Sequence, residues 1–110
     1  MNINVPGPVE TYLAAEKAKD TEMLGQCFRE DAIVRDEGRE HRGVAAIKAW
    51  HREVSAKFRY VVEPLDASVG GPAVVVVRAR VTGDFPGSPV EMRLNFTVSE
   101  DRIVSLEVAP

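Results

Sequence analysis

A stretch near the C terminus alternates strictly between apolar and polar residues, and it constrains the fold more than any other part of the sequence. Its apolar residues are Val90, Met92, Leu94, Phe96 and Val98. The residues between them are polar or charged. Side chains on a β-strand point alternately to the two faces of a sheet, so the stretch predicts a strand with one dry face and one polar face. Other elements of the chain must cover the dry face.

The same period of two runs through the C-terminal half of the chain, from Arg59 onward. Residues typical of turns interrupt it at 70–72, 83–89 and 99–102. The pattern therefore predicts four long antiparallel strands joined by turns.

Helices are predicted before these strands. Apolar residues recur every three to four positions over residues 9–19, which places Tyr12 on the inward stripe of a first helix. Asp20 predicts the N-cap of a second, shorter helix. Gly43 precedes a third helix, whose apolar stripe includes His51 or passes beside it.

A small hairpin is predicted between the second and third helices. Residues 32–36 are β-prone and are followed by a Glu-Gly turn and a polar partner strand over residues 39–42. Helices followed by an antiparallel meander are typical of α+β proteins, in which the helices cover one sheet face. We therefore expect a single α+β domain over residues 1–110.

The composition is that of an ordinary globular protein and limits its partners. Hydrophobic residues make up 45% of the 110 residues and charged residues 28%, which is enough apolar surface for one core. The formal charge is −3 and the basic residues are scattered, so we expect no nucleic acid partner. No apolar run approaches the roughly 20 residues that a membrane-spanning helix needs, so we expect no membrane location.

The single cysteine, Cys27, excludes an internal disulfide. The N-terminal sequence MNINVPGPVE has neither the basic nor the apolar region of a secretory signal. We therefore expect a cytoplasmic protein. Cys27 is expected on the apolar face of the second helix, in the core, because no base lies beside it in the sequence to make it a nucleophile.

Three phrases in the N-terminal half resemble the nuclear transport factor 2-like superfamily, which contains ketosteroid isomerase and the SnoaL-type polyketide cyclases. They are the tyrosine of the first helix, the F-x-x-D-A-x-V-x-D phrase that ends at Asp36, and the R-G-x-x-A-I start of the third helix. The order of elements agrees along nearly the whole chain. The resemblance implies a cone-shaped, curved antiparallel sheet with three N-terminal helices that enclose a pocket, a cystatin-like arrangement.

The resemblance also implies roles for single residues. Tyr12 matches the tyrosine that donates a hydrogen bond to the substrate oxygen in ketosteroid isomerases, and Asp36 matches their proton-shuttling aspartate. A third group, a carboxylic acid in the penultimate strand, is expected near Leu94, where this chain has no acid. Loss of one such donor typically slows a reaction by about 100 to 1000-fold, which counts against steroid isomerisation. Asn95 is the nearest alternative donor if the strand is shifted in register.

Each candidate residue also has a structural interpretation. Asp36 is either a general base at a pocket mouth or the end of a hairpin that satisfies backbone N–H groups. Tyr12 either polarises a ligand carbonyl or is a core tyrosine. His51 either acts as an acid or base near neutral pH or is a satisfied structural group. His41 and the acids beside it match no ligand spacing, so we expect no metal and no other cofactor.

Two functions fit these observations. The first is a small-molecule enzyme, an isomerase, cyclase or epoxide hydrolase, in which Asp36 moves a proton and Tyr12 or His51 stabilises developing charge on an apolar molecule with an oxygen function. The alternative is a non-catalytic module that binds a ligand or another protein. In both, the expected pocket lining is Trp50, Phe58, Met92, Leu94, Asn95 and Phe96. Related domains commonly pair through the outer sheet face, so we also expect a homodimer.

Overall fold

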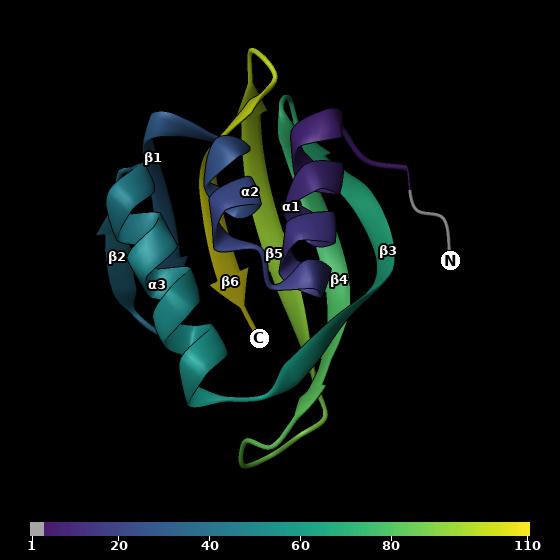
Figure 1. The fold of residues 1–110 in the computed structure, drawn as a ribbon. Helices are drawn as coiled ribbons and strands as arrows, with labels where there is room; N and C mark the ends of the chain where they lie inside the picture. The colour runs from purple at the N-terminus through teal and green to yellow at the C-terminus, as the bar shows by residue number, and fades with distance from the viewer. Residues whose placement is uncertain (1–3) are drawn as a thin grey trace.

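The computed structural model describes residues 4–110, so the first three residues of the expected domain lie outside the described residues. Figure 1 shows helices in front of a curved sheet. The helices are α1 (Gly7–Ala18), α2 (Thr21–Gln26) and α3 (Val44–Lys57). The strands are β1 (Phe28–Asp36), β2 (Arg39–Arg42), β3 (Tyr60–Gly71), β4 (Val74–Gly83), β5 (Val90–Ser99) and β6 (Arg102–Ala109).

The six strands form one sheet in the order β2-β1-β6-β5-β4-β3. The four long strands β3 to β6 pair antiparallel in sequence order, which confirms the predicted meander. One pair of neighbours departs from the antiparallel pattern, because β1 runs parallel to β6 and Val34 lies opposite Leu106. The sheet is therefore mixed. No turn joins β1 to β6, so local sequence signals could not reveal the direction of this pair.

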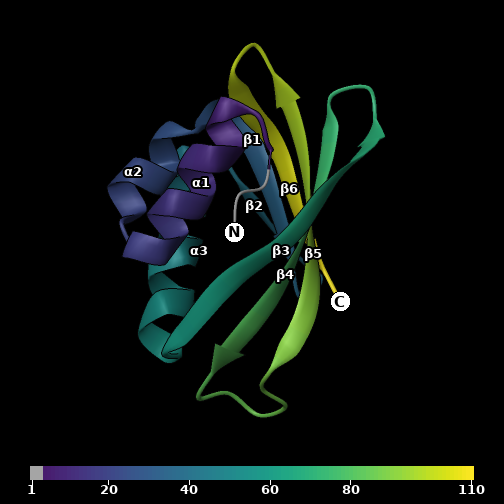
Figure 2. The ribbon, with the colours of Figure 1, turned by 90° about the vertical axis from the view of Figure 1, so that its right-hand side faces the viewer.

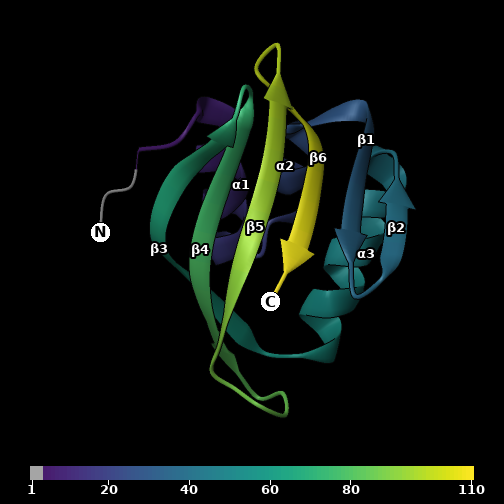
Figure 3. The ribbon, with the colours of Figure 1, turned by 180° about the vertical axis from the view of Figure 1, so that it is seen from behind.

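The helices cover one face of the sheet and leave the other face open. Figure 2 shows all three helices on the same side, and Figure 3 shows the strands from behind without a helix in front of them. On β5 the residues predicted for the dry face point toward the helices, as the buried Leu94 and Phe96 show. Glu91 and Arg93, between them in the alternation, are exposed. The α+β class and the predicted two-faced strand are confirmed.

Local sequence signals explain how the helices and the hairpin begin and end. The Asp20 side chain accepts a 3.0 Å hydrogen bond from the backbone N–H of Met23, so it caps α2 as predicted. Glu37 and Gly38 both have positive φ, 52° and 75°, as the tight turn between β1 and β2 requires. The expectation that Cys27 lies within the second helix is wrong, because α2 ends at Gln26 and Cys27 is its buried C-cap.

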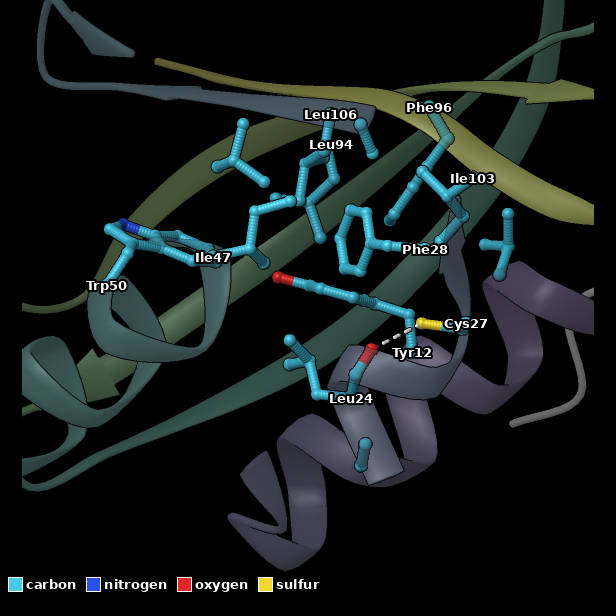
Figure 4. Packing of buried hydrophobic residues seen from close by; sticks show 14 of the residues in the cluster. Tyr12, Leu24, Cys27, Phe28, Ile47, Trp50, Leu94, Phe96, Ile103 and Leu106 are labelled. Carbon is cyan, nitrogen blue, oxygen red and sulfur yellow. Dashed lines mark hydrogen bonds between the residues drawn. The ribbon is translucent and has the colours of Figure 1, made fainter. Parts of the chain in front are cut away.

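The core lies between the helices and the sheet, and Tyr12 is near its centre (Figure 4). The ring of Tyr12 packs edge-on against Phe28 and Phe96, with ring centroids 6.0 and 5.2 Å apart. Such edge-to-face pairs are favourable because the positive edge of one ring meets the negative face of the other. In the part of the chain that the structure describes, no helix is both long and apolar enough to cross a membrane.

Candidate functional site

A cavity of about 580 Å³ lies between the helices and the sheet, a volume typical of small-molecule pockets. Side chains from α1, α3 and all six strands line it. Most of the wall is aliphatic or aromatic, and charged side chains, among them Glu37, Arg39, Glu53 and Lys57, also line it. The other polar groups of the wall are Tyr12, Glu16, Asp36, His41 and Tyr60.

Asp36 lies in the cavity wall at the end of β1, and its carboxylate has a fixed partner. The indole Nε1 of Trp50 on α3 donates a hydrogen bond of 3.1 Å to Oδ2 of Asp36. The contact orients the carboxylate and leaves Oδ1 without a hydrogen bond to another described residue. Asp36 is therefore a positioned acceptor in the cavity wall. Its strength as a base stays a prediction.

Tyr12 lies in the same cavity wall, and in Figure 4 its hydroxyl end points away from α1 toward Ile47. Only 3% of the residue is exposed, and among residues 4–110 no side chain or backbone atom makes a hydrogen bond with its hydroxyl. Burial raises the pKa of Tyr12 well above its ordinary value of 10.0, and the nearby charge of Glu16 raises it further. Tyr12 is thus a neutral hydrogen-bond donor that faces the cavity.

His51 lies elsewhere. The structure buries it at the back of α3, 1% exposed, and it is not among the residues that line the cavity. Its Nδ1 is 2.7 Å from the hydroxyl of Thr21 at the start of α2, and its Nε2 is 3.2 Å from Oε2 of Glu16. The structure therefore brings Tyr12 and Asp36 to one cavity and places His51 behind that cavity, among the helices.

The residues expected to line the pocket divide into two groups. Trp50, Phe58, Met92 and Leu94 all lie in the cavity wall. Phe96 does not, because it is fully buried in the core under Tyr12. Asn95 points to the opposite face of the sheet, where its amide donates a 3.2 Å hydrogen bond to the carbonyl of Glu107. Leu94 thus occupies the wall position at which the family resemblance places an acid.

Sequence reasoning missed several residues of the wall. Glu16 follows Tyr12 by four positions, so its place on the inward stripe of the first helix was a usable signal. Tyr60 alternates with Val61 and so shares a sheet face with the cavity-lining Val62. Phe85, in the loop before β5, had no such signal, and tertiary contact with Phe58 at 5.9 Å between ring centroids positions it.

The sequence of this chain matches a known protein family over most of its length. The family model described as the SnoaL-like domain matches residues 9–106. The chain belongs to the SnoaL-like domain family. This agrees with the resemblance of the sequence to the nuclear transport factor 2-like superfamily. No curated protein matches the chain.

Solved structures similar to this SnoaL-like domain give the same fold. A candidate polyketide cyclase from Sinorhizobium meliloti is 42% identical, with a TM-score of 0.90 and 94% of each chain covered. A protein with a ketosteroid isomerase-like fold from Catenulispora acidiphila, in complex with trimethylamine, is 22% identical, with a TM-score of 0.84 over 97% of this chain and 87% of that chain. A cystatin-fold protein from Novosphingobium aromaticivorans is 19% identical, with a TM-score of 0.78 over 94% and 95%.

Proposed function

We propose that this chain is a single SnoaL-like domain that binds a small, mostly apolar molecule with an oxygen function and catalyses proton transfer beside that oxygen. One observation carries the proposal: Asp36 and Tyr12 line the same cavity, where they offer an oriented carboxylate and a neutral hydroxyl donor. A base and an oxyanion donor that face one apolar cavity are the two groups that enolate chemistry needs.

In the proposed reaction, the carboxylate of Asp36 removes a proton from the carbon next to a ligand carbonyl. The electron pair of that C–H bond forms an enolate, whose oxygen accepts a hydrogen bond from Tyr12. The enolate carbon then attacks a second carbonyl carbon of the same molecule, and the new alkoxide takes back the proton that Asp36 holds. The result is a ring closure in which every proton is accounted for.

The choice of ring closure rests on two supports. The Sinorhizobium meliloti protein, similar over 94% of this chain, is a candidate polyketide cyclase. Leu94 also leaves the cavity without the acid that the family resemblance implies for steroid isomerisation. Isomerisation of a ketone would begin with the same proton transfer to Asp36, whereas epoxide opening would cause no hydrogen exchange next to a carbonyl.

The probe for the test is 2-acetonaphthone, an apolar ketone with acidic methyl hydrogens next to its carbonyl. In D2O, the wild-type protein should speed the replacement of these hydrogens by deuterium, measured by proton NMR. Asp36→Asn should reduce this rate to that of buffer, because the amide is not a base. Asp31→Asn is the matched control, since Asp31 lies on the same strand but is exposed and paired with Arg29. Equal rates in wild type and Asp36→Asn would refute the proposal.

A non-catalytic binding module is the second candidate, and one observation favours it. One oxygen of the Asp36 carboxylate already accepts the Trp50 hydrogen bond. An aspartate with a purely structural role, joining the hairpin to α3, would make the same contact. For this candidate, 2-acetonaphthone would raise the unfolding temperature of the wild-type protein without any acceleration of exchange. The two measurements on one probe therefore separate the enzyme from the binder.

We further propose that two copies of the chain pair through the open sheet face, in the cytoplasm. That face carries Val61, which is 65% exposed, and an Arg78 side chain that contacts both Asp66 and Glu91. Such mixed charge and apolar surface suits a self-complementary contact. Sedimentation at micromolar concentration tests the pairing, and a strictly monomeric mass would contradict it.

A further inference from the structure

A second carboxylate lies in the cavity wall, away from Asp36. Glu16 is on α1, one helical turn after Tyr12, and although it lines the cavity only 4% of the residue is exposed. An ionised carboxylate buried to this degree is costly unless other groups compensate its charge. The surroundings of Glu16 therefore decide whether it carries a charge.

Two neighbours keep Glu16 ionised. The Lys19 ammonium is 2.6 Å from Oε1, and the His51 ring nitrogen Nε2 is 3.2 Å from Oε2. Burial alone would raise the pKa of the Glu16 carboxyl, but the contacts with His51 and Lys19 outweigh burial and lower the pKa to about 2. At neutral pH the cavity wall thus contains a carboxylate whose charge Lys19 balances.

His51 holds this carboxylate in place from behind. The Thr21 hydroxyl lies 2.7 Å from Nδ1, and the Glu16 carboxylate beside Nε2 favours the tautomer with its proton on Nε2, in which the hydroxyl donates to Nδ1. The Nε2–Oε2 contact is close but too poorly aligned for a full hydrogen bond, and Nε2 has no other partner among residues 4–110. Oε2 therefore keeps most of its capacity to accept a hydrogen bond.

Other polar groups lie close to Glu16. The Lys19 ammonium lies 3.4 Å from the centroid of the Tyr60 ring, which holds Tyr60 beside Glu16. Burial raises the pKa of Tyr60, and the charge of Glu16 adds to the shift, so its phenol stays neutral. The buried hydroxyl of Ser55 lies near Tyr60, behind the cavity wall and not in it, without a well-formed hydrogen bond to any described residue. We call Glu16, Ser55 and Tyr60 the inner polar cluster.

The inner polar cluster plays no part in the proton transfer proposed for Asp36. Asp36 reaches the cavity from the β1–β2 edge of the sheet, whereas Tyr60 reaches it from β3 at the opposite edge. The wall also contains apolar side chains such as Met92 and Leu94. A ligand in this cavity therefore meets polar groups from two sides.

We propose that Glu16 is a ligand-binding residue that accepts a hydrogen bond from a hydroxyl group of the ligand, so that the ligand is held at two polar positions. This inference rests on the proposed function, because it requires a small molecule in the cavity. Lys19 already balances the charge of Glu16, so a neutral hydroxyl suits the site better than a second cation. The substrate class is accordingly a hydroxylated compound with two carbonyl groups.

Two ketones that differ by one hydroxyl test this proposal, namely 2-acetonaphthone and 6-hydroxy-2-acetonaphthone. Their dissociation constants are measured by titration calorimetry at pH 7. The wild-type protein should bind the hydroxylated ketone about tenfold more tightly, as expected for one hydrogen bond to a charged acceptor. In Glu16→Gln this preference should fall to about threefold or less, because the amide is a weaker, neutral acceptor.

Two control variants show whether the effect belongs to Glu16. Glu22→Gln makes the same change in an exposed glutamate that bridges Lys48 and Arg52, and it should keep the tenfold preference. Asp36→Asn tests another carboxylate acceptor of the cavity wall, and loss of the preference in this variant but not in Glu16→Gln would overturn the inference. If Glu16 only fastened the helices, Glu16→Gln would lower the unfolding temperature and leave the ratio of the two constants unchanged.

A second measurement uses only the wild-type protein, so it does not depend on whether a variant folds. In wild-type protein labelled with ¹³C at glutamate carboxyl groups, the Glu16 signal should shift on addition of the hydroxylated ketone and not on addition of the parent ketone. Equal affinities for both ketones, or an unmoved Glu16 signal, would overturn the inference alone if 2-acetonaphthone still binds. If neither ketone binds the wild-type protein, the proposed function and this inference both fail.

Discussion

Trp50 and Asp36 are joined by a 3.1 Å hydrogen bond from the indole Nε1 to Oδ2. The contact links the middle of α3 to the end of β1 at the cavity wall, and Trp50 itself is only 8% exposed. A hydrogen bond from a buried ring to a carboxylate both fixes the orientation of the acid and contributes to stability. Because of this hydrogen bond, the role of Asp36 can be tested by stability measurements as well as by activity measurements.

We expect Trp50→Phe and Asp36→Ala to be coupled in a double-mutant cycle. Each single change removes the same hydrogen bond, so the double variant should be more stable than the sum of the single losses predicts, by about 1 kcal/mol or more. Unfolding by urea gives the free energies. Strict additivity would mean that the bond contributes nothing to stability. Trp50→Phe should also slow deuterium exchange in 2-acetonaphthone, because the carboxylate loses its orientation.

Stability at acid pH should depend on Glu16. The pKa of this carboxyl is about 2 in the folded protein, below its ordinary value of 4.5, so the folded state favours the ionised form. Its contribution is therefore complete above about pH 5 and is lost as the pH falls toward 2. The shift corresponds to about 3 kcal/mol at neutral pH, of which about 2 kcal/mol is lost by pH 3.

Urea unfolding at pH 7 and pH 3 measures this dependence. The free energy of unfolding should fall less between the two pH values in Glu16→Gln than in wild type. The control is Glu22→Gln, whose carboxylate is exposed and paired with Lys48 and Arg52 on the helix surface, and it should behave like wild type. An equal fall in Glu16→Gln and wild type would show that Lys19 and His51 do not hold the carboxylate ionised.

The stabilities of two variants at neighbouring positions should show which side of β5 faces the cavity. Leu94 is 6% exposed in the cavity wall, so Leu94→Asn should cost about 3 kcal/mol through lost packing and a buried amide. Asn95 lies on the open face, and Asn95→Ala should change stability by less than about 1 kcal/mol. Thermal and urea unfolding give both values, and the reverse order would mean that the strand is shifted by one residue.

The thiol of Cys27 should be unreactive in the folded protein. It is 4% exposed, it donates a 2.9 Å hydrogen bond to the carbonyl of Leu24, and burial raises its pKa to about 12. Because the thiolate is the reactive form, a thiol-specific disulfide reagent at pH 8 should react fully only after the protein is unfolded in urea. Rapid reaction of the native protein would show that the core opens at α2.

Much of the fold could be predicted because its signals are local. The alternation around Leu94, the Asp20 cap and the Glu37-Gly38 turn each depend on a few neighbouring residues, and all three are as predicted. The parallel pairing of β1 with β6 could not be seen in the same way. It joins residues far apart in the chain, such as Val34 and Leu106, through contacts that leave no local pattern.

In the candidate site, too, some residues could be predicted from the sequence, and others could be placed only by the tertiary structure. The family resemblance pointed to Tyr12 and Asp36, and the helical period carried the unused signal for Glu16. Tertiary structure alone decided that Trp50 donates to Asp36 and that His51 lies behind the cavity against Glu16. The sequence by itself determined which faces of each helix and strand are apolar, because side-chain direction follows from backbone geometry. Only the packing of these faces against one another decided which polar groups meet in the cavity, since that depends on distances between segments far apart in the chain.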